Sequence, residues 1–501
     1  MASLADTAPR TSIDRPFAQC LAILAALTAV RLVGLAFSDV DFYFDESQYW
    51  AWSRELAFGY FSKPPLLAWV IAGAEFVCGS SEACIRAPSP LFYLGTCVVS
   101  YWIAEALYDR QTAFWVAMCL GFNAAVAFSS RIISTDVPLL FFWAVALLAY
   151  VKLLQGGTLK WGIVLGLSFG LGTLAKYPML CFAIGVAAAA AIDRDARNLL
   201  RSRALWVAAG IGILLILPNA IWNARNGFVT LQHVGDNIEG AGAVFSPRSG
   251  LEFLASQFAV FGPVIFSVLL IVLVRAAKPD VTRADRLMLC FALPVLAIIT
   301  ATAFTTRAHA NWAAASIVAA NILGVAVLVR RAAWRWIALS IGIGAGVQVA
   351  VFLGDPNARR LSVSWLKSPD VYNRTLGWRE LGEEVEKLAR RTGARTIVSE
   401  DRAEIASLLY YQRNTGRAVL AWPRRPAPNH HFDLTRRLTA AAPEPILFVS
   451  FCPSAKRFAS HYRNVEALGP FETRTGPTMT RRYFAYSLSG PIGEIGPVTG
   501  C

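Results

Sequence analysis

Apolar runs of about 15 to 25 residues recur through the first 355 positions, and they constrain the fold of this chain more than any other feature. A helix rises ~1.5 Å per residue, so each run is close to the length that crosses ~30 Å of hydrocarbon. The composition agrees, because 55% of the 501 residues are hydrophobic and only 16% are charged, which is less charge than soluble chains carry. The sequence therefore predicts a polytopic α-helical membrane protein.

We expect about eleven transmembrane helices from these runs, together with juxtamembrane helices. The expected spans are residues 20–38, 87–107, 112–128, 137–154, 161–175, 178–192, 204–222, 251–275, 287–306, 312–329 and 334–353. Residues 66–78 are also apolar, but about 13 residues are too few for a span. That segment is expected to form a juxtamembrane or re-entrant helix.

The positions of Lys and Arg orient these spans, because short basic loops stay on the cytoplasmic side of a membrane. With Arg10 and Arg15 inside, every strongly basic short loop is cytoplasmic. These loops are residues 109–110, 160, 194–203, 275–286 and 330–335. A crossing by residues 66–78 would place all of them outside, so the charge bias disfavours it. The other loops and the C-terminal region are then expected on the outer face.

The last 145 or so residues have the mixed helix and strand patterns of a small α/β domain. The predicted domains are therefore residues 1–355 and 356–501. The expected helices are residues 378–391 and 403–411, and the expected strands are residues 395–399, 418–422, 446–451 and 483–488. Two cysteine pairs fall on the oxidising face, Cys78 with Cys84 and Cys452 with Cys501. Disulfides and free thiols are equally good readings for both pairs.

A compact set of charges follows the first span: Asp41, Asp45 and Glu46, and then Lys63 before two prolines. Ionisable groups at a bilayer boundary are costly unless they are solvated or functional. Taken alone, Asp45 could be a helix N-cap that forms a capping box with Gln48, and Lys63 could be a lysine whose head reaches to the interface.

Later outer loops add more polar groups at the same membrane face. Asp136 precedes a span and could also be only a cap, whereas Lys176 interrupts an apolar run and needs water or an anion. His309 and Asn311 precede Trp312, which is a typical interface anchor. Each residue has an ordinary explanation, but their coincidence on one face indicates a reaction centre.

These residues resemble the GT-C membrane glycosyltransferases of families 39 and 83, which include the bacterial aminoarabinose transferase to lipid A and the dolichyl-phosphate-mannose protein mannosyltransferases. The resemblance covers residues 20 to about 355 and extends to the outer C-terminal domain. Its strongest points are Asp45-Glu46, the Tyr60 to Pro65 segment, Arg86 before a span, Asp136 with Pro138, and the Gly170 to Lys176 segment.

The resemblance implies a bacterial inner-membrane enzyme, with its active site facing the periplasm, that moves a sugar from a polyprenyl-phosphate donor to a lipid or glycan acceptor with inversion. Lipid A or lipopolysaccharide core is the favoured acceptor, the other partners are membrane lipids, and nucleic acid is not expected. By the same resemblance Asp45 is the general base, and Glu46 and Asp136 orient hydroxyls. Asp45 and Asp136 are also the candidate ligands for Mg or Mn, the one cofactor considered.

The remaining roles implied by the resemblance concern the donor phosphate and the sugar. Cations bind the donor phosphate and stabilise the charge that grows on it as it leaves: Lys63 and Lys176, with Arg86 and Arg131 as weaker candidates. The sugar or acceptor pocket is expected to be lined by Tyr60, His309 and Asn311.

The motif from His309 to Trp312 departs from the aminoarabinose transferase, which leaves the sugar and the acceptor open. A protein O-mannosyltransferase-like enzyme remains a reading of the same fold. A lipid-linked sugar transporter or flippase predicts charges near the bilayer midplane and internal symmetry, neither of which the sequence has. A non-catalytic envelope assembly protein predicts that Asp45 is replaceable.

Overall fold

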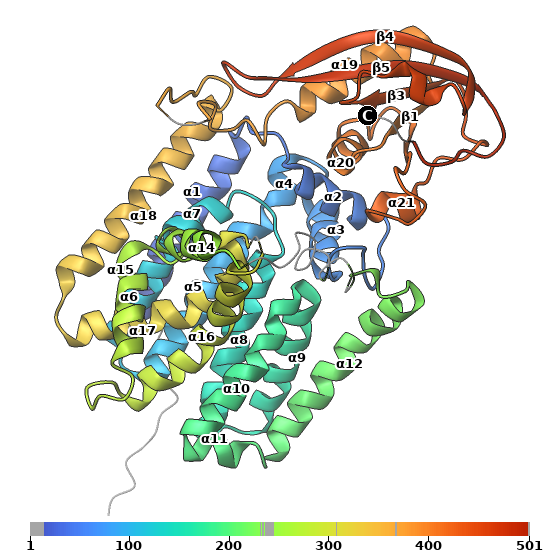
Figure 1. The fold of residues 1–501 in the computed structure, drawn as a ribbon. Coiled ribbons are helices and arrows are strands. Elements are labelled where there is room, and N and C mark those ends of the chain that lie inside the picture. The colour runs from blue at the N-terminus through green and yellow to red at the C-terminus, as the bar shows by residue number, and fades with distance from the viewer. Residues whose placement is uncertain are drawn as a thin grey trace, which may run out of the picture.

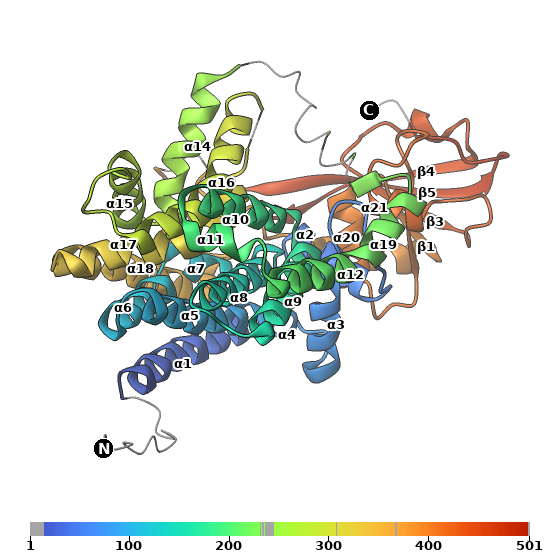
Figure 2. The same ribbon diagram turned by 90° about the horizontal axis from the view of Figure 1, so that it is seen from below.

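The computed structural model describes residues 15–230, 232, 235, 245–306, 308–365 and 368–498. Arg10 of the orientation argument and Cys501 of the second cysteine pair lie outside these residues. Within them the chain forms a bundle of helices with a five-stranded sheet at one end (Figure 1). The view from below places the sheet away from α15 (Pro263–Val274) (Figure 2).

The bundle is built from helices of very different length. Its α-helices are α1 (Arg15–Ala36), α5 (Pro88–Leu107), α6 (Arg110–Gly121), α7 (Ala124–Ser129), α8 (Asp136–Leu154), α9 (Leu159–Ala175), α10 (Cys181–Ile192), α11 (Arg194–Leu199), α12 (Arg203–Arg225), α14 (Pro247–Val260), α15, α16 (Arg283–Ala303), α17 (Ile317–Arg330) and α18 (Trp334–Gly354). Short 3-10 helices, η1 (Tyr177–Leu180), η2 (Ala310–Ser316) and η3 (Asp355–Asn357), lie at helix ends. The first outer loop carries α2 (Phe44–Ser53), α3 (Leu66–Cys78) and α4 (Glu82–Arg86).

Seven helices in the described part of the chain are long and apolar enough to cross a membrane, and the pair α14–α15 makes an eighth if it counts as one span. The polytopic helical fold is therefore confirmed. The expected count of about eleven differs because three expected spans are short helices. The span expected at 112–128 is broken into α6 and α7, α9 has 17 residues, and the segment Tyr177–Ile192 has 16.

The prediction of one continuous span at residues 251–275 is wrong. It consists of α14 and α15, which meet at an angle of 118°. Gly262 makes the bend with a φ of 86°, a left-handed conformation that glycine adopts without steric cost, and Pro263 then starts α15. Periodicity alone does not reveal such a bend, because both arms are apolar.

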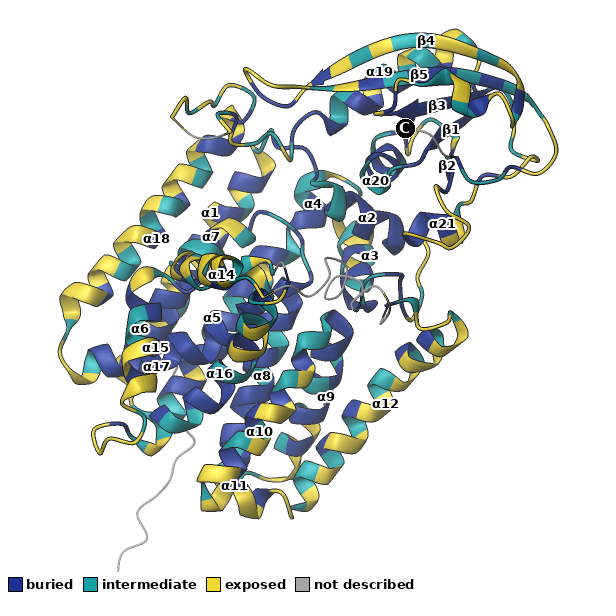
Figure 3. Ribbon diagram, in the orientation of Figure 1, coloured by how far each residue is buried: buried dark blue, intermediate teal, exposed yellow. Residues whose placement is uncertain are grey.

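Burial separates central helices from outer ones (Figure 3). Most of α8 and of the Ala310–Arg330 segment is buried inside the protein, whereas 17% of the apolar window of α12 and 22% of that of α18 are buried. The outer helices present large apolar side chains such as Leu214 and Leu353 to the surroundings. This arrangement fits helices that contact lipid.

The basic loops meet at the end of the bundle opposite the sheet. Arg283 pairs with Asp193 and with Asp195, and Arg330 pairs with Asp285 at 2.6 Å. The loops that follow α10, α15 and α17 therefore share one face, as the orientation argument expects.

The C-terminal domain has a five-stranded sheet in the order β2-β1-β3-β5-β4. The strands are β1 (Thr396–Ser399), β2 (Ala418–Ala421), β3 (Ile446–Ser450), β4 (Tyr462–Arg474) and β5 (Thr480–Pro491), and the helices are α19 (Trp378–Thr392), α20 (Arg402–Tyr411), α21 (His431–Thr435) and the 3-10 helix η4 (Ala455–Phe458). The first three strands in this order are parallel, and β5 and β4 add antiparallel pairs. The expected α/β domain is confirmed, with β4 as an additional strand.

The first outer loop and the C-terminal domain share one hydrophobic core. Buried residues of the loop, including Phe42, Trp50 and Leu67, belong to the same cluster as Leu381 of α19 and Leu408 of α20. The C-terminal domain is therefore packed directly on α2 and α3, and this packing fixes α2 between the sheet domain and the bundle.

Candidate functional site

Asp45 lies in the first turn of α2 and does not cap the helix. The N-cap is Tyr43, and Glu46 forms the capping box by accepting a hydrogen bond from the Tyr43 backbone N–H at 3.0 Å. The capping box expected between Asp45 and Gln48 is therefore wrong. The Asp45 carboxylate is left for another interaction.

That interaction comes from the C-terminal domain. Arg402, at the first position of α20, donates to the Asp45 carboxylate at 2.8 Å and to the Gln48 side chain at 3.0 Å. Its guanidinium also lies 4.9 Å from the centre of the Phe44 ring. Asp45 and Arg402 are each 36% exposed, so this ion pair faces open space.

A second charged group joins three outer loops. The Lys176 ammonium lies 2.6 Å from the Asp136 carboxylate, and the Asn311 amide donates to the other Asp136 oxygen at 2.8 Å. Asp136 makes no capping bond at the start of α8, and Lys176 is held at the end of α9, where the chain turns into η1. The structure thus brings Asp136, Lys176 and Asn311 together.

Lys63 lies within electrostatic range of both groups. Burial and the nearby Lys176 lower the pKa of Lys63 to about 8, while Asp45 and Asp136 act in the opposite direction. The Lys63 ammonium forms no ion pair or hydrogen bond with the described residues. A half-buried ammonium in this state is suited to an anion supplied from outside the protein.

Tyr49 also lies within electrostatic range of both groups. Burial raises its pKa well above the usual value, and the charges of Asp45 and Asp136 act in the same direction. The charged centre therefore consists of Asp45, Lys63, Asp136, Lys176 and Arg402, with Tyr49 and Asn311 beside it; we call this set the charged centre below. Its contributors come from α2, from the segment before α3, from α8, α9 and η2, and from α20.

Glu46 and Arg86, expected beside the substrate, form a buried ion pair instead. Their closest atoms are 2.7 Å apart, and their side chains are 2% and 3% exposed. Glu46 also accepts from the backbone N–H of Ile133 at 3.0 Å, and Arg86 donates to the backbone oxygens of Val40 and Asp41. The bond to Ile133 ties the first outer loop to the bundle, and the bonds of Arg86 hold the two ends of that loop together.

Three other expected residues also lie apart from the charged centre or at its edge. Arg131 pairs with Asp355 and donates to the last turn of α18. Tyr60 is 1% exposed and stacks on Trp52, and its hydroxyl donates to the Trp52 backbone oxygen at 2.9 Å. His309 is exposed and lies two residues before Asn311, and its ring contacts that of Trp312.

Asp41 anchors the C-terminal domain to the membrane part. It is fully buried and accepts from the Trp378 and Arg379 backbone N–H groups at the start of α19, as well as from the Arg359 side chain at 2.8 Å. A carboxylate at a helix N-terminus is stabilised by the unpaired N–H groups there. Asp41 therefore holds α19 in place, rather than reacting.

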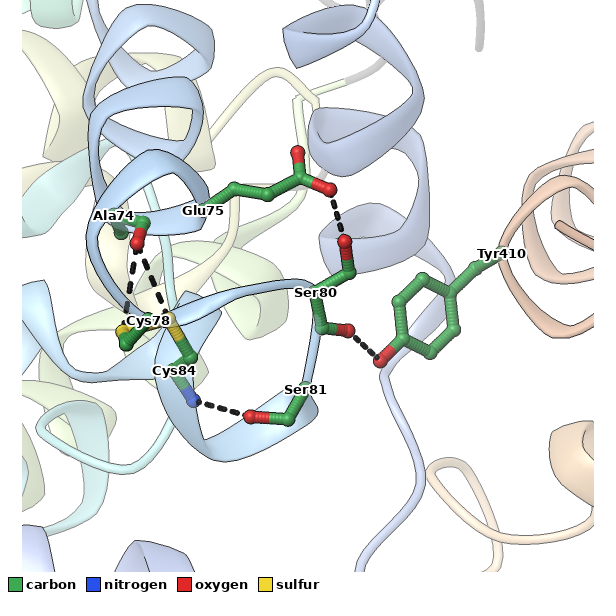
Figure 4. Close-up of a disulfide and its surroundings, with 7 residues drawn as sticks. All are labelled: Ala74, Glu75, Cys78, Ser80, Ser81, Cys84 and Tyr410. Atoms are coloured by element: carbon green, nitrogen blue, oxygen red, sulfur yellow. Dashed lines mark hydrogen bonds between the residues drawn. A yellow bond between two sulfur atoms is a disulfide. The ribbon is translucent and has the colours of Figure 1, made fainter. Parts of the chain in front are cut away.

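A disulfide joins Cys78 to Cys84 and closes the loop between α3 and α4 (Figure 4). Within the loop Ser80 donates to Glu75, and the Ser80 backbone oxygen accepts from the Tyr410 hydroxyl of α20 at 2.8 Å. The disulfide thus stabilises a loop on which the C-terminal domain rests.

The described residues contain no group of three or more His, Cys, Asp or Glu side chains that could hold a metal ion. Asp45 and Asp136 are each engaged by a cationic side chain, Arg402 and Lys176. Binding of Mg or Mn by these two carboxylates stays a prediction, and it would require at least one of the ion pairs to open.

Sequence reasoning missed Arg402 and Tyr49. Arg402 follows β1 at its carboxyl end, the edge of a parallel sheet where functional side chains collect, and that position was the available signal. Its partner was not predictable, because 357 positions separate Arg402 from Asp45. Tyr49 gave no signal that distinguishes it from core aromatic residues.

The chain is similar to several known proteins. The family described as dolichyl-phosphate-mannose-protein mannosyltransferase matches residues 62–222. The lipid A galacturonosyltransferase RgtD of Rhizobium johnstonii is 32% identical and covers 86% of this chain and 90% of its own length. The lipopolysaccharide core galacturonosyltransferase RgtA of the same organism is 25% identical over 44% of this chain and 46% of its own.

Among solved structures, ArnT from Cupriavidus metallidurans bound to undecaprenyl phosphate has a TM-score of 0.64 and 14% identity, covering 93% of this chain and 97% of its own. The apo state of ArnT has a TM-score of 0.59, at 12% identity. These structures share the fold, and RgtD matches nearly the whole sequence. The chain belongs to the GT-C family of membrane glycosyltransferases.

Proposed function

We propose that this glycosyltransferase moves a galacturonosyl unit from a polyprenyl-phosphate carrier to lipid A at the periplasmic face of a bacterial inner membrane, with inversion at the anomeric carbon. The observation that carries the proposal is the convergence of Asp45, Asp136, Lys63, Lys176 and Arg402 at one end of the bundle. The donor follows from the undecaprenyl phosphate bound to ArnT, and the sugar and acceptor follow from RgtD.

The charge of the centre suits an anionic sugar. Three cations, Lys63, Lys176 and Arg402, face two carboxylates, Asp45 and Asp136. The donor adds one negative charge on the phosphodiester and one on the uronate. Arg402 presents the planar donor fork that binds carboxylates in two-point contacts, and it already holds a carboxylate in this structure.

The reaction needs one proton acceptor and one site for growing negative charge. Asp45 takes the proton from the acceptor hydroxyl as its oxygen forms the new bond to the anomeric carbon. The bond from that carbon to the carrier phosphate breaks on the opposite face, and the electron pair leaves with the phosphate. Lys63 and Lys176 stabilise that charge, and Asp136 and Asn311 position the Lys176 ammonium.

The orientation of the protein supports a periplasmic reaction. The charged centre and the C-terminal domain lie at the end of the bundle opposite the basic loops, which the charge bias retains in the cytoplasm. The Cys78–Cys84 disulfide, at the same end as the charged centre, agrees with an oxidising compartment.

Transfer by the purified full-length chain tests the proposal. The protein is supplied with lipid A and with polyprenyl-phosphate galacturonic acid or its neutral galactose counterpart, and the products are weighed by mass spectrometry. We expect lipid A to gain one galacturonosyl unit and the neutral donor to react at least about tenfold more slowly, as expected for loss of a charge-assisted contact with Arg402. Equal use of both donors would overturn the choice of sugar. Donor carried across vesicles with no transfer would indicate a flippase and overturn the enzyme.

A further inference from the structure

An apolar groove of about 540 Å³ opens between α15, α17 and α18, far from the charged centre. One wall is a single face of α15, on which Val264, Val268, Ile271 and Arg275 recur every three or four residues. Val327, Leu328 and Leu339 supply the opposite side. The groove is therefore lined by hydrocarbon along its length and by charge at one end.

The length of the groove fits one leaflet of a bilayer. The lining runs along α15 from Pro263 to Arg275, and the 12 residues of this helix extend ~18 Å. Half of the ~30 Å hydrocarbon core is ~15 Å. Because α15 begins at the Gly262 bend, its first residue lies near mid-membrane depth. The groove therefore matches the length of a single acyl chain.

The charged end of the groove has an excess of arginine. Arg275 and Arg331 both pair with the same carboxylate, Asp280, at 2.9 Å each, so one positive charge is not balanced. Arg330 is matched separately by the buried Asp285. Trp336 lies at the same level and is 43% exposed, as is common for tryptophan at a lipid headgroup boundary.

We propose that this groove binds an anionic phospholipid of the leaflet opposite the C-terminal domain. One acyl chain lies along α15, and the headgroup phosphate contacts Arg275 and Arg331 in place of part of their bonding to Asp280. The polyprenyl-phosphate donor does not fit the same site, because its phosphate must reach Lys63 and Lys176 at the other end of the bundle. The surplus charge selects an anionic headgroup over a zwitterionic one.

Lipid retention by the full-length protein tests this site. The protein is exchanged into detergent with phosphatidylglycerol or phosphatidylcholine, and bound lipid is counted by native mass spectrometry. We expect phosphatidylglycerol to be retained at least about fivefold more than phosphatidylcholine. The double variant Arg275→Gln/Arg331→Gln should lose that preference, whereas Lys278→Gln, an exposed basic residue of the same loop outside the groove, should keep it.

Two further variants keep the test decisive if the double variant folds poorly. Asp280→Asn removes the competing carboxylate and should increase phosphatidylglycerol retention. Ser267→Trp fills the middle of the groove and should reduce retention of both lipids. Equal retention of the two lipids by the unchanged protein, or equal loss in Lys278→Gln and the double variant, would overturn the proposal.

Discussion

Arg402 of the C-terminal domain lies 2.8 Å from Asp45 of the first outer loop, although 357 positions separate them in the sequence. The pair completes the charged centre from outside the membrane-spanning part. A GT-C core without its C-terminal domain would therefore lack one of the three cations of the charged centre, so the domain contributes to the charged centre and does not only cover it.

Arg402→Lys should reduce kcat/KM at least about tenfold, because lysine keeps the charge but loses the planar guanidinium, which contacts Asp45 and Gln48 through Nη1 and lies over the Phe44 ring. The measurement is steady-state transfer by purified protein. Arg395→Lys, an exposed arginine just before β1 whose side chain forms no hydrogen bond or ion pair with the described residues, is the matched control and should be unaffected. A wild-type rate for Arg402→Lys would show that transfer does not depend on the Arg402 guanidinium.

The pH dependence of donor use should report Lys63. Because burial lowers the pKa of Lys63 to about 8, the ammonium is lost as pH rises through 8, and kcat/KM for the donor should fall above that pH. Lys63→Arg stays charged and should move the alkaline limb to higher pH. Lys160→Arg, at the opposite end of the bundle, should leave the profile unchanged.

Loss of the folded state through titration of Lys63 does not explain a fall in kcat/KM above pH 8. The unfolded lysine, with its pKa near 10.5, binds more protons than the folded one between pH 8 and 10.5. The contribution of Lys63 to the free energy of unfolding therefore rises with pH in this window while activity falls. An alkaline limb that persists unchanged in Lys63→Arg would contradict the assignment.

Much of this architecture is predictable from sequence because it follows from short-range patterns. Apolar runs gave the bundle, and alternation with turn residues gave four of the five strands. β4 was missed because it is an edge strand with polar side chains and with Gly469 and Pro470 inside it, a composition that edge positions tolerate. The bend at Gly262 was missed because both of its arms are equally apolar.

The site residues also divide into those that local sequence patterns predict and those that only the packed structure reveals. Asp136, Lys176 and Asn311 were predictable as one group because they sit at the ends of spans, where polar residues are conspicuous. Glu46 and Arg86 gave the same local signal, and only their mutual burial distinguishes a structural pair from a reacting one. Arg402 depends on how the C-terminal domain packs on α2, which no local pattern encodes.

Glu46→Gln should destabilise the protein by about 3 to 5 kcal/mol, because it leaves the buried Arg86 charge without its partner. The measurement is the thermal midpoint in detergent. The double variant Glu46→Gln/Arg86→Met removes both charges and should recover part of the loss. A normal midpoint with abolished transfer would instead give Glu46 a catalytic role.

Asp136 and Lys176 should act as one unit in catalysis. Asp136→Asn and Lys176→Met should each reduce kcat/KM, and the double variant should be no worse than the more damaging single variant. A double-mutant cycle on transfer rates measures this coupling. Fully additive losses would show that the two side chains contribute independently.

The most direct test of the account is the transfer rate of Asp45→Asn. This change keeps the shape of the side chain and removes the proton acceptor, so we predict a loss of at least about 100-fold in kcat with normal folding. Asp39→Asn, a partly exposed aspartate of the same loop that pairs with Arg359, is the control and should retain activity. Transfer to lipid A at the wild-type rate by folded Asp45→Asn would contradict the central claim that the charged centre performs the reaction.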